Sequence, residues 1–258
     1  MLVRLIEFFG VIIVKPVEGV GRALLLLGSV LKNIFKPPFD IRNIFGQMLE
    51  IGVNSLPVVL ITAIFTGMVL ALQSFTGFKR FGAEGLVGSV VALSMTRELG
   101  PVLSALIVTG RAGAAMAAEL GTMRVTEQID ALETLATNPV KYLVVPRFLS
   151  GTIMLPALAV VTDIVGIIGG YLVTVVWLGA SSKAYMRATW DFLKTDDIYS
   201  GLIKSCFFGA AFTLISCYKG FYAKGGAEGV GQATTGAVVF SSMTILISDY
   251  FLSAWLFK

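Results

Sequence analysis

A charged dipeptide followed by a proline interrupts an otherwise apolar stretch of this sequence. Arg97 and Glu98 are adjacent, and Pro101 follows about one helical turn later. An ionised side chain at the centre of a bilayer costs about 2.5–3.5 kcal/mol on insertion scales, so it usually faces a cavity or a partner. Adjacent helix positions do not face each other, so these two charges should point in different directions. Pro101 offers no N–H to the carbonyl of Arg97, which predicts a kink at a functional site. The alternative is that both charges lie near the outer interface and are hydrated.

Other charges stand alone in apolar stretches. Lys204 is a candidate partner for Glu98 from another helix. Asp163, Lys204 and Asp249 could instead form a relay, as in an ion-coupled secondary transporter. That class usually carries a pair of internal repeats, and we see no repeat in this sequence. We keep it as the second hypothesis.

Several kinds of chemistry are excluded by residue type. The sequence has no histidine, and its two cysteines, Cys206 and Cys217, share one apolar stretch, where we expect small buried hydrophobic residues. No stretch matches the phosphate-binding pattern GxxxxGK[ST]. We therefore expect no catalytic residue, no metal site, no cofactor and no ATP hydrolysis in this chain. The net charge of +4 reports loop orientation and headgroup contact, so we expect no nucleic-acid partner.

The elements that must position these charges are membrane-spanning helices. Hydrophobic residues make up 56% of the chain and charged residues only 14%, whereas soluble domains carry about 25%. A spanning helix needs about 20 mostly apolar residues, and continuous apolar runs favour helices over the alternating strands of a barrel. We predict an all-α integral membrane protein with about five spans, at residues 51–72, 86–118, 148–178, 198–218 and 232–257.

Residues 1–45 differ from the rest. They mix short apolar clusters with regularly placed charges, and Pro16 interrupts them. We predict an interfacial segment on the cytoplasmic face, with a poorly formed first span as the alternative. Lysine and arginine are more frequent in the segments that lie inside if the N-terminus is cytoplasmic, which places the C-terminus outside.

The segment 119–137 is amphipathic. Apolar and acidic residues interleave there at helical spacing, namely Ile129, Leu132 and Leu135 with Glu127, Asp130 and Glu133. An acidic face would be repelled by anionic headgroups. We therefore predict a helix that docks on a cytoplasmic partner.

Small residues recur every four positions in two predicted spans. They are Gly113, Ala117 and Gly121, then Gly110, Ala114 and Ala118, and also Gly166 and Gly170. This spacing lets helices approach closely in lipid, so we predict tight packing.

Four ordered motifs resemble the MlaE/YrbE permease family. They are 96–102 (TRELGPV), 110–113 (GRAG), 118–123 (AELGTM) and 127–132 (EQIDAL), and 225–231 (GGAEGVG) looks like the final loop of that family. The chain length also agrees. The N-terminal segment and the loop 181–197 look individual to this sequence.

The resemblance implies a single permease domain, residues 1–258, in the inner membrane of a diderm bacterium. Members are homodimers that join cytoplasmic ABC ATPases, which bind the ATP, to a periplasmic hexameric ring of MCE-domain subunits, with a small STAS-type subunit as an optional further partner. They move phospholipids between inner and outer membranes, and some relatives handle sterols or other lipids.

The resemblance also assigns roles to residues. Arg97, Glu98 and Leu99 would line or support a lipid pocket, with Leu70 and Gln73 of the first span nearby. We add Lys204 to this set as the candidate partner of Glu98 that the lone charges suggest, not as a residue that the resemblance assigns. Those that would seat in the ATPase are Glu119, Met123, Glu127, Asp130 and Leu132.

Overall fold

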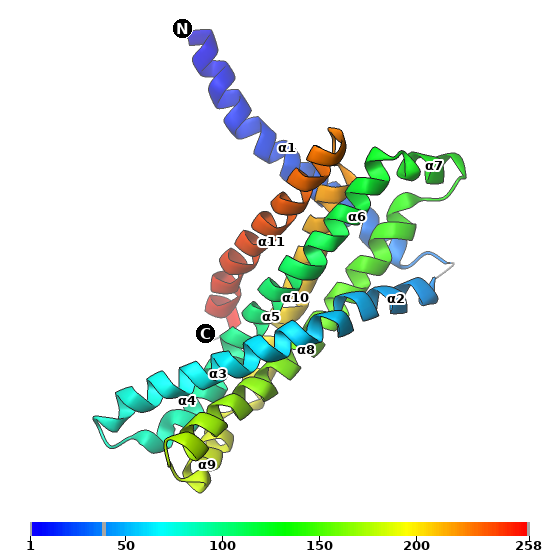
Figure 1. The fold of residues 1–258 in the computed structure, drawn as a ribbon. Helices are drawn as coiled ribbons and strands as arrows, with labels where there is room; N and C mark the ends of the chain where they lie inside the picture. The colour runs from blue at the N-terminus through cyan, green and yellow to red at the C-terminus, as the bar shows by residue number, and fades with distance from the viewer. Residues whose placement is uncertain (1, 38–39, 257–258) are drawn as a thin grey trace.

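The computed structural model of the chain describes residues 2–37 and 40–256, and nearly all of them are helical (Figure 1). Within these residues, five helical stretches are long and apolar enough to cross a membrane. They are Ile41–Lys79, Glu84–Val125, Val140–Trp177, Thr195–Phe221 and Gly226–Leu256. Each contains the core of one predicted span, so the five spans and the all-α membrane fold are confirmed.

The spanning stretches are built from the following elements. They are α2 Ile41–Ile51 and α3 Leu56–Lys79; α4 Val87–Ser94, η3 Met95–Leu99, α5 Gly100–Val108, η4 Thr109–Gly113 and α6 Ala114–Val125; η5 Val140–Val144, α8 Val145–Tyr171 and η6 Leu172–Trp177; α10 Thr195–Phe221; and α11 Gly226–Leu256. The elements η3, η4, η5 and η6 are π-helical turns. Two shorter helices, α7 Gln128–Thr134 and α9 Ser182–Phe192, lie at opposite ends of the bundle (Figure 1).

The N-terminal segment forms one long helix. Helix α1 runs from Leu2 to Ile34 and continues through Pro16, so the predicted interruption there is wrong. A proline removes one backbone donor, and that loss does not end this helix. The start of α1 projects away from the bundle (Figure 1). The last predicted residues of the segment, from Ile41, belong instead to α2 and the first spanning stretch. The interfacial location of α1 stays a prediction.

The predicted helix over residues 119–137 is divided. Helix α6 ends at Val125, and Glu127 takes a left-handed conformation with φ of 61° before α7 begins at Gln128. A non-glycine residue in that region breaks the helical path. The acidic segment is therefore the end of a span plus a separate turn of helix.

Helix α8 lies at the centre and packs against α2, α3, α5 and α10. Glycines make these contacts close, because a Cβ at Gly67 would overlap the carbonyl oxygen of Gly166, and one at Gly209 would overlap that of Gly151. Backbones that approach this closely provide the packing that holds helices together in lipid. The predicted contact role of Gly166 is confirmed.

The two small-residue series of the second span behave differently. A Cβ at Gly113 would lie 2.9 Å from the hydroxyl of Ser216, and one at Gly220 would lie 2.7 Å from the carbonyl of Ala117. This series therefore packs α6 against α10, as predicted. Gly110 of the other series has no atom within 4 Å of such a Cβ, so tight packing is not found there.

The apolar interior forms two clusters. The larger lies toward the α7 end and includes Phe208, Phe212 and Ile129. The smaller lies toward the α9 end and includes Met95 and Tyr185. Burial raises the pKa of the Tyr185 hydroxyl above its ordinary value, so it stays protonated and donates to the carbonyl of Ile167 at 3.1 Å. This bond ties α9 to α8.

Gly67→Ala should destabilise the bundle. The added methyl meets backbone atoms of Gly166, which cannot rotate away, and overpacking of this kind costs about 1–3 kcal/mol. Gly77→Ala is the matched control, since it lies in the same helix with open space around it. Thermal unfolding in detergent should show a lower midpoint for Gly67→Ala alone. Equal midpoints would contradict the close α3–α8 contact.

Candidate functional site

The two charges of the predicted site point to different partners. Arg97 contacts Asp197 at the start of α10, with its Nη2 and Nε 2.7 Å and 2.8 Å from Oδ1. Glu98 instead contacts Lys204 of α10, where Oε2 lies 2.6 Å from Nζ. The divergence expected for adjacent helix positions is confirmed, and so is the pairing of Glu98 with Lys204.

Lys204 is the most buried charge of this site, with 0% of its residue surface exposed. Its ammonium lies 2.6 Å from the hydroxyl of Ser253 and 3.2 Å from Oδ1 of Asp249, both on α11. Together with Glu98 these contacts surround the ammonium with oxygens. Three chain segments, η3, α10 and α11, therefore meet at one lysine.

Pro101 explains a further contact of the same lysine. Because proline has no N–H, the carbonyl of Arg97 lacks that donor. The ammonium of Lys204 donates to this carbonyl at 2.9 Å. A kink was predicted here, and the structure has a π-helical turn, Met95–Leu99, that ends two residues before Pro101. The sequence TRELGP thus provides a backbone carbonyl, that of Arg97, which accepts a hydrogen bond from a lysine of another helix. The same sequence forms the π-helical turn in which this carbonyl lies.

The cluster is buried on one side and open on the other. The side chains of Glu98 and Arg97 are 39% and 38% exposed, whereas those of Lys204 and Asp197 are almost completely covered. If both carboxylates that contact Lys204 are ionised, that group carries one excess negative charge. The exposed edge of Glu98 is therefore available to a ligand that brings a hydrogen-bond donor or a positive charge.

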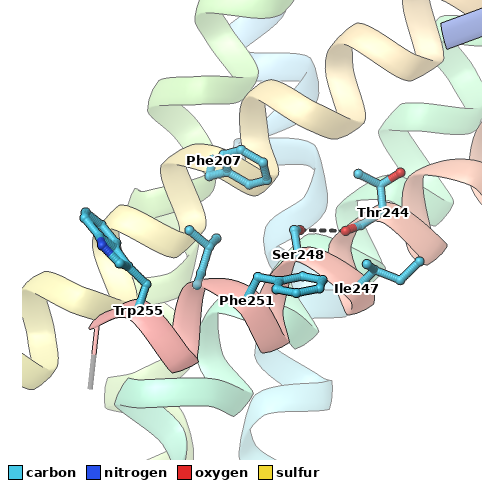
Figure 2. Close-up of a pocket in the computed structure, with 7 residues that line it drawn as sticks. Phe207, Thr244, Ile247, Ser248, Phe251 and Trp255 are labelled. Atoms are coloured by element: carbon cyan, nitrogen blue, oxygen red, sulfur yellow. Dashed lines mark hydrogen bonds between the residues drawn. The ribbon is translucent and has the colours of Figure 1, made fainter. Parts of the chain in front are cut away.

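An apolar groove lies beside the cluster, between α10 and α11 (Figure 2). Its volume is about 380 Å³, and it is lined by Phe207, Thr244, Ile247, Ser248, Phe251, Leu252 and Trp255. The hydroxyl of Ser248 donates to the carbonyl of Thr244 at 2.6 Å, so it is satisfied within its own helix. Asp249 and Ser253, which contact Lys204, each directly follow a residue of the groove lining, Ser248 and Leu252. The cluster and the groove therefore lie on neighbouring faces of α11.

The remaining predicted lipid-contacting residues are spread more widely. Leu70 and Leu99 both pack against the apolar cluster at the α9 end. Gln73 is exposed and lines a separate surface depression with Arg80 and Phe81. The structure brings Leu70 and Leu99 to one cluster but does not join Gln73 to the charged site.

Some residues of the site were missed by sequence reasoning. Asp197 was assigned to a polar loop, and nothing in the sequence distinguishes Ser253. Asp249 was associated with Lys204 only in the relay of the second hypothesis, and its place in the same cluster as Glu98 was not predicted. Of the predicted relay, the contact between Lys204 and Asp249 is present, but among the described residues no ion pair joins Asp163 to either of them, and Oδ1 of Asp163 is buried without a hydrogen-bond partner.

The predicted coupling residues occupy the α7 end. Glu119 pairs with the buried Arg147 of α8 at 2.8 Å, and Asp130 pairs with Arg124 at 2.5 Å. Both carboxylates therefore have partners within the chain. Glu127 is exposed and forms the turn before α7.

The apolar residues of this segment divide between the core and the surface. Met123 and Leu132 pack partly against the main apolar cluster, and Ile129 is fully buried. Leu135, in contrast, is 74% exposed. A half-anchored segment with acidic residues and an exposed leucine is suited to contact with another protein.

A second arginine, Arg111, ties the middle of the second spanning stretch, Glu84–Val125, to the first. Arg111, in the π-helical turn Thr109–Gly113, pairs with Glu50 at 2.9 Å and donates to the hydroxyl of Ser55 at 2.9 Å. It also donates to the carbonyl of Glu50. This network links the end of α2 to the second spanning stretch.

A helical bundle of five spanning stretches, with a partly buried charged cluster beside an apolar groove, is the architecture of a multi-pass membrane protein. The profile of the family described as Permease MlaE matches residues 44–255. The chain therefore belongs to the MlaE permease family, whose members include ABC transporter permeases, and it is a multi-pass protein of the inner membrane.

Relatives at high identity support this membership. A probable ABC transporter permease protein of Rickettsia prowazekii is 50% identical over 258 residues, which is all of both chains. The intermembrane phospholipid transport system permease protein MlaE of Haemophilus influenzae is 39% identical, covering 100% of this chain and 99% of that one. The chloroplastic protein trigalactosyldiacylglycerol 1 of Arabidopsis thaliana is 40% identical over 95% of this chain and 71% of its own length.

Lys204→Met should destabilise the protein more than removal of an exposed lysine. The change leaves Glu98 and Asp249 without their shared cation, and breaking a buried pair costs about 3–5 kcal/mol. Adding Asp249→Asn to Lys204→Met should recover part of the loss, because one of the two carboxylates is then neutral. Lys183→Met, at an exposed position of α9, is the control. Thermal unfolding is measured for the wild type, each single variant (Lys204→Met and Asp249→Asn), the double variant and the control, and additive effects of the two changes would argue against the cluster.

Proposed function

We propose that this chain is the membrane-spanning subunit of an ABC transporter that moves phospholipids between two membranes, with ATP hydrolysed by a separate cytoplasmic subunit. The name of the Haemophilus influenzae relative specifies intermembrane phospholipid transport, and the names of the Rickettsia relatives specify ABC transporter permeases. The sequence of this chain also lacks a phosphate-binding loop.

The observation that carries the proposal is the position of the enclosed charges beside the apolar groove. A phospholipid has a charged head and apolar chains, so its site needs both kinds of surface side by side. Glu98 offers a partly exposed carboxylate held by Lys204. The groove between α10 and α11 offers aromatic and aliphatic walls, including Phe207 and Phe251 (Figure 2).

In this proposal each residue has a distinct role. The headgroup contacts Glu98 and Arg97, while the buried Lys204 acts as a positioning residue that fixes the carboxylate. An acyl chain lies in the groove. Leu70 and Leu99 extend the apolar wall toward α3, and Gln73 meets the headgroup only while the lipid enters or leaves.

The partners follow from the two ends of the bundle. The ATPase contacts the α7 end, where Glu127 and Leu135 are exposed. A ring of MCE-domain subunits contacts the α9 end. The N-terminus is then cytoplasmic and the C-terminus periplasmic.

A second copy of this chain completes the site in our proposal. Only a narrow stripe of α11 is buried, formed by Gly229, Ala233, Ala237, Ser241 and Ile245. Much of the rest of the helix is exposed and apolar, including the groove. A homodimer joined along α11 would enclose the groove and give the lipid a closed path.

Ser248→Trp should slow lipid transfer by filling the groove. Excluding two methylene groups of an acyl chain, at about 0.8 kcal/mol each, weakens binding by about tenfold. The control is Ile164→Trp, at an exposed position of α8. Transfer of a labelled phospholipid between vesicles, with the ATPase and ATP present, provides the measurement.

Two results would refute the proposal. Unchanged transfer by Ser248→Trp would separate the groove from the lipid path. Full transfer driven by an ion gradient without ATP would favour the secondary transporter instead.

Glu127→Arg combined with Leu135→Asp should release the ATPase. The two changes reverse a charge and remove an apolar contact at the exposed part of the α7 end. Interface residues of this kind contribute about 1–3 kcal/mol, so affinity should fall at least about tenfold. Asp191→Arg, on α9 at the other end, is the control. Co-purification of the ATPase with each variant tests the docking assignment, which fails if both variants retain it equally.

A further inference from the structure

A second cavity lies at the α7 end, away from the charged cluster. It lies among the end of α1, the start of α2 and the start of α8, and its volume is about 690 Å³. Its walls are formed by Asn33, Lys36, Asp40, Ile44, Ala136, Thr137, Asn138, Lys141, Tyr142, Val145, Pro146 and Leu149. A cavity of this size is in the range of small-molecule sites of about 300–1,000 Å³ and far exceeds the space of a single ion.

The polar wall of this cavity carries excess positive charge. Lys36 and Lys141 both line it, and among the described residues neither ammonium has a carboxylate within ion-pair distance. Lys141 donates to the carbonyl of Pro37 at 2.8 Å, a neutral acceptor that holds its head in place without cancelling its charge.

The one acidic group of the wall is already engaged. Asp40 accepts the backbone N–H of Asn43 at 3.1 Å and so caps the start of α2. A carboxylate at that position interacts favourably with the helix dipole. Asp40 therefore offsets the charge of at most one lysine, and the two lysines leave the wall with one net positive charge to meet a ligand.

Asn138 adds hydrogen-bonding capacity. Its Oδ1 accepts the backbone N–H groups of Val140 and Lys141 at 3.0 Å and 3.2 Å. The amide nitrogen of the same side chain therefore faces away from those bonds and can donate. Two lysines and an amide donor match the oxygens of a phosphate group.

The other wall of the cavity is apolar. Ile44, Val145 and Leu149 come from the two spanning stretches that begin here, and Tyr142 is partly exposed beside them. A free anion gains no binding energy from an apolar wall, whereas the glycerol and upper acyl chains of a lipid would pack against it and remove it from water. Basic pockets between spanning helices at the cytoplasmic side are suited to anionic headgroups.

We propose that this cavity binds an anionic glycerophospholipid of the inner leaflet as a resident ligand, distinct from the lipid that is transported. The leaflet follows from the orientation proposed above. Because the loop after α7 supplies Ala136, Thr137 and Asn138 to the wall, a bound lipid braces the segment that carries α7. The composition of the inner leaflet then affects the ATPase contact without touching Glu98 or Lys204.

Native mass spectrometry of the purified full-length chain tests the site. The protein is titrated with phosphatidylglycerol, phosphatidylethanolamine or inorganic phosphate. The wild type should retain phosphatidylglycerol in preference to phosphatidylethanolamine. The double variant Lys36→Gln with Lys141→Gln should bind phosphatidylglycerol about 25-fold more weakly, at about fivefold for each lysine.

Three further variants serve as controls. Lys141→Arg keeps the charge and should retain the lipid, as should Lys183→Gln at an exposed position of α9. Lys36→Gln alone should lower the affinity for phosphatidylglycerol about fivefold. Because Lys36 is exposed, this variant keeps the test valid if the double variant misfolds.

The proposal is overturned if the two phospholipids bind equally, if the lysine variants keep the preference, or if inorganic phosphate displaces phosphatidylglycerol at equal concentration. That last result would indicate a free-anion site. None of these measurements depends on transport, so they are independent of the function proposed above.

Discussion

A lysine ammonium without access to solvent constrains the part of this bundle where η3, α10 and α11 meet. In hydrocarbon such a charge is tolerated only when opposing charges and hydrogen bonds replace its water. Glu98, Asp249 and Ser253 provide them around Lys204. Glu98 comes from the second spanning stretch, Asp249 and Ser253 come from α11, and Lys204 comes from α10, so three spanning helices must approach one another at this level. The same close approach places the partly exposed carboxylate of Glu98 beside the groove between α10 and α11. The contacts that stabilise Lys204 therefore also form the candidate binding site.

The irregular turn before Pro101 makes this arrangement possible. A π-helical turn widens the helix locally and rotates the residues that follow it. Arg97 and Glu98 lie in that turn, and the carbonyl of Arg97 accepts from Lys204. The turn also needs close neighbours without side chains. A Cβ at Gly201 would overlap the carbonyl of Thr96, so α10 reaches η3 only because that residue is glycine.

The sequence predicts this fold well and the site in part. Apolar runs determine the spans because the bilayer leaves the backbone few choices, and the cost of a lone charge led directly to the pairing of Glu98 with Lys204. Asp197 and Ser253 could not be found that way, since hydrophilic residues at a span end or within an apolar helix give no sign of their partner. The division at Glu127 was also missed, because amphipathic spacing does not report a left-handed residue. For Asp197 and Ser253, the missing information is the distance to a partner that lies far away in the chain.

One helical path, Glu84–Val125, connects the charged cluster with the α7 end of the bundle. It carries Arg97 and Glu98 in one π-helical turn and Arg111 in another, and it leads through Glu127 into α7. Each irregular turn is tied to a different part of the bundle, η3 to α10 and η4 to the end of α2. A shift of the α7 end along this path must therefore either carry those neighbours with it or break their ion pairs. In the proposed function, the residues that contact the lipid headgroup and the segment that leads to the ATPase contact therefore belong to one spanning stretch. An arginine in each of its two π-helical turns, Arg97 and Arg111, ties that stretch to a neighbouring helix.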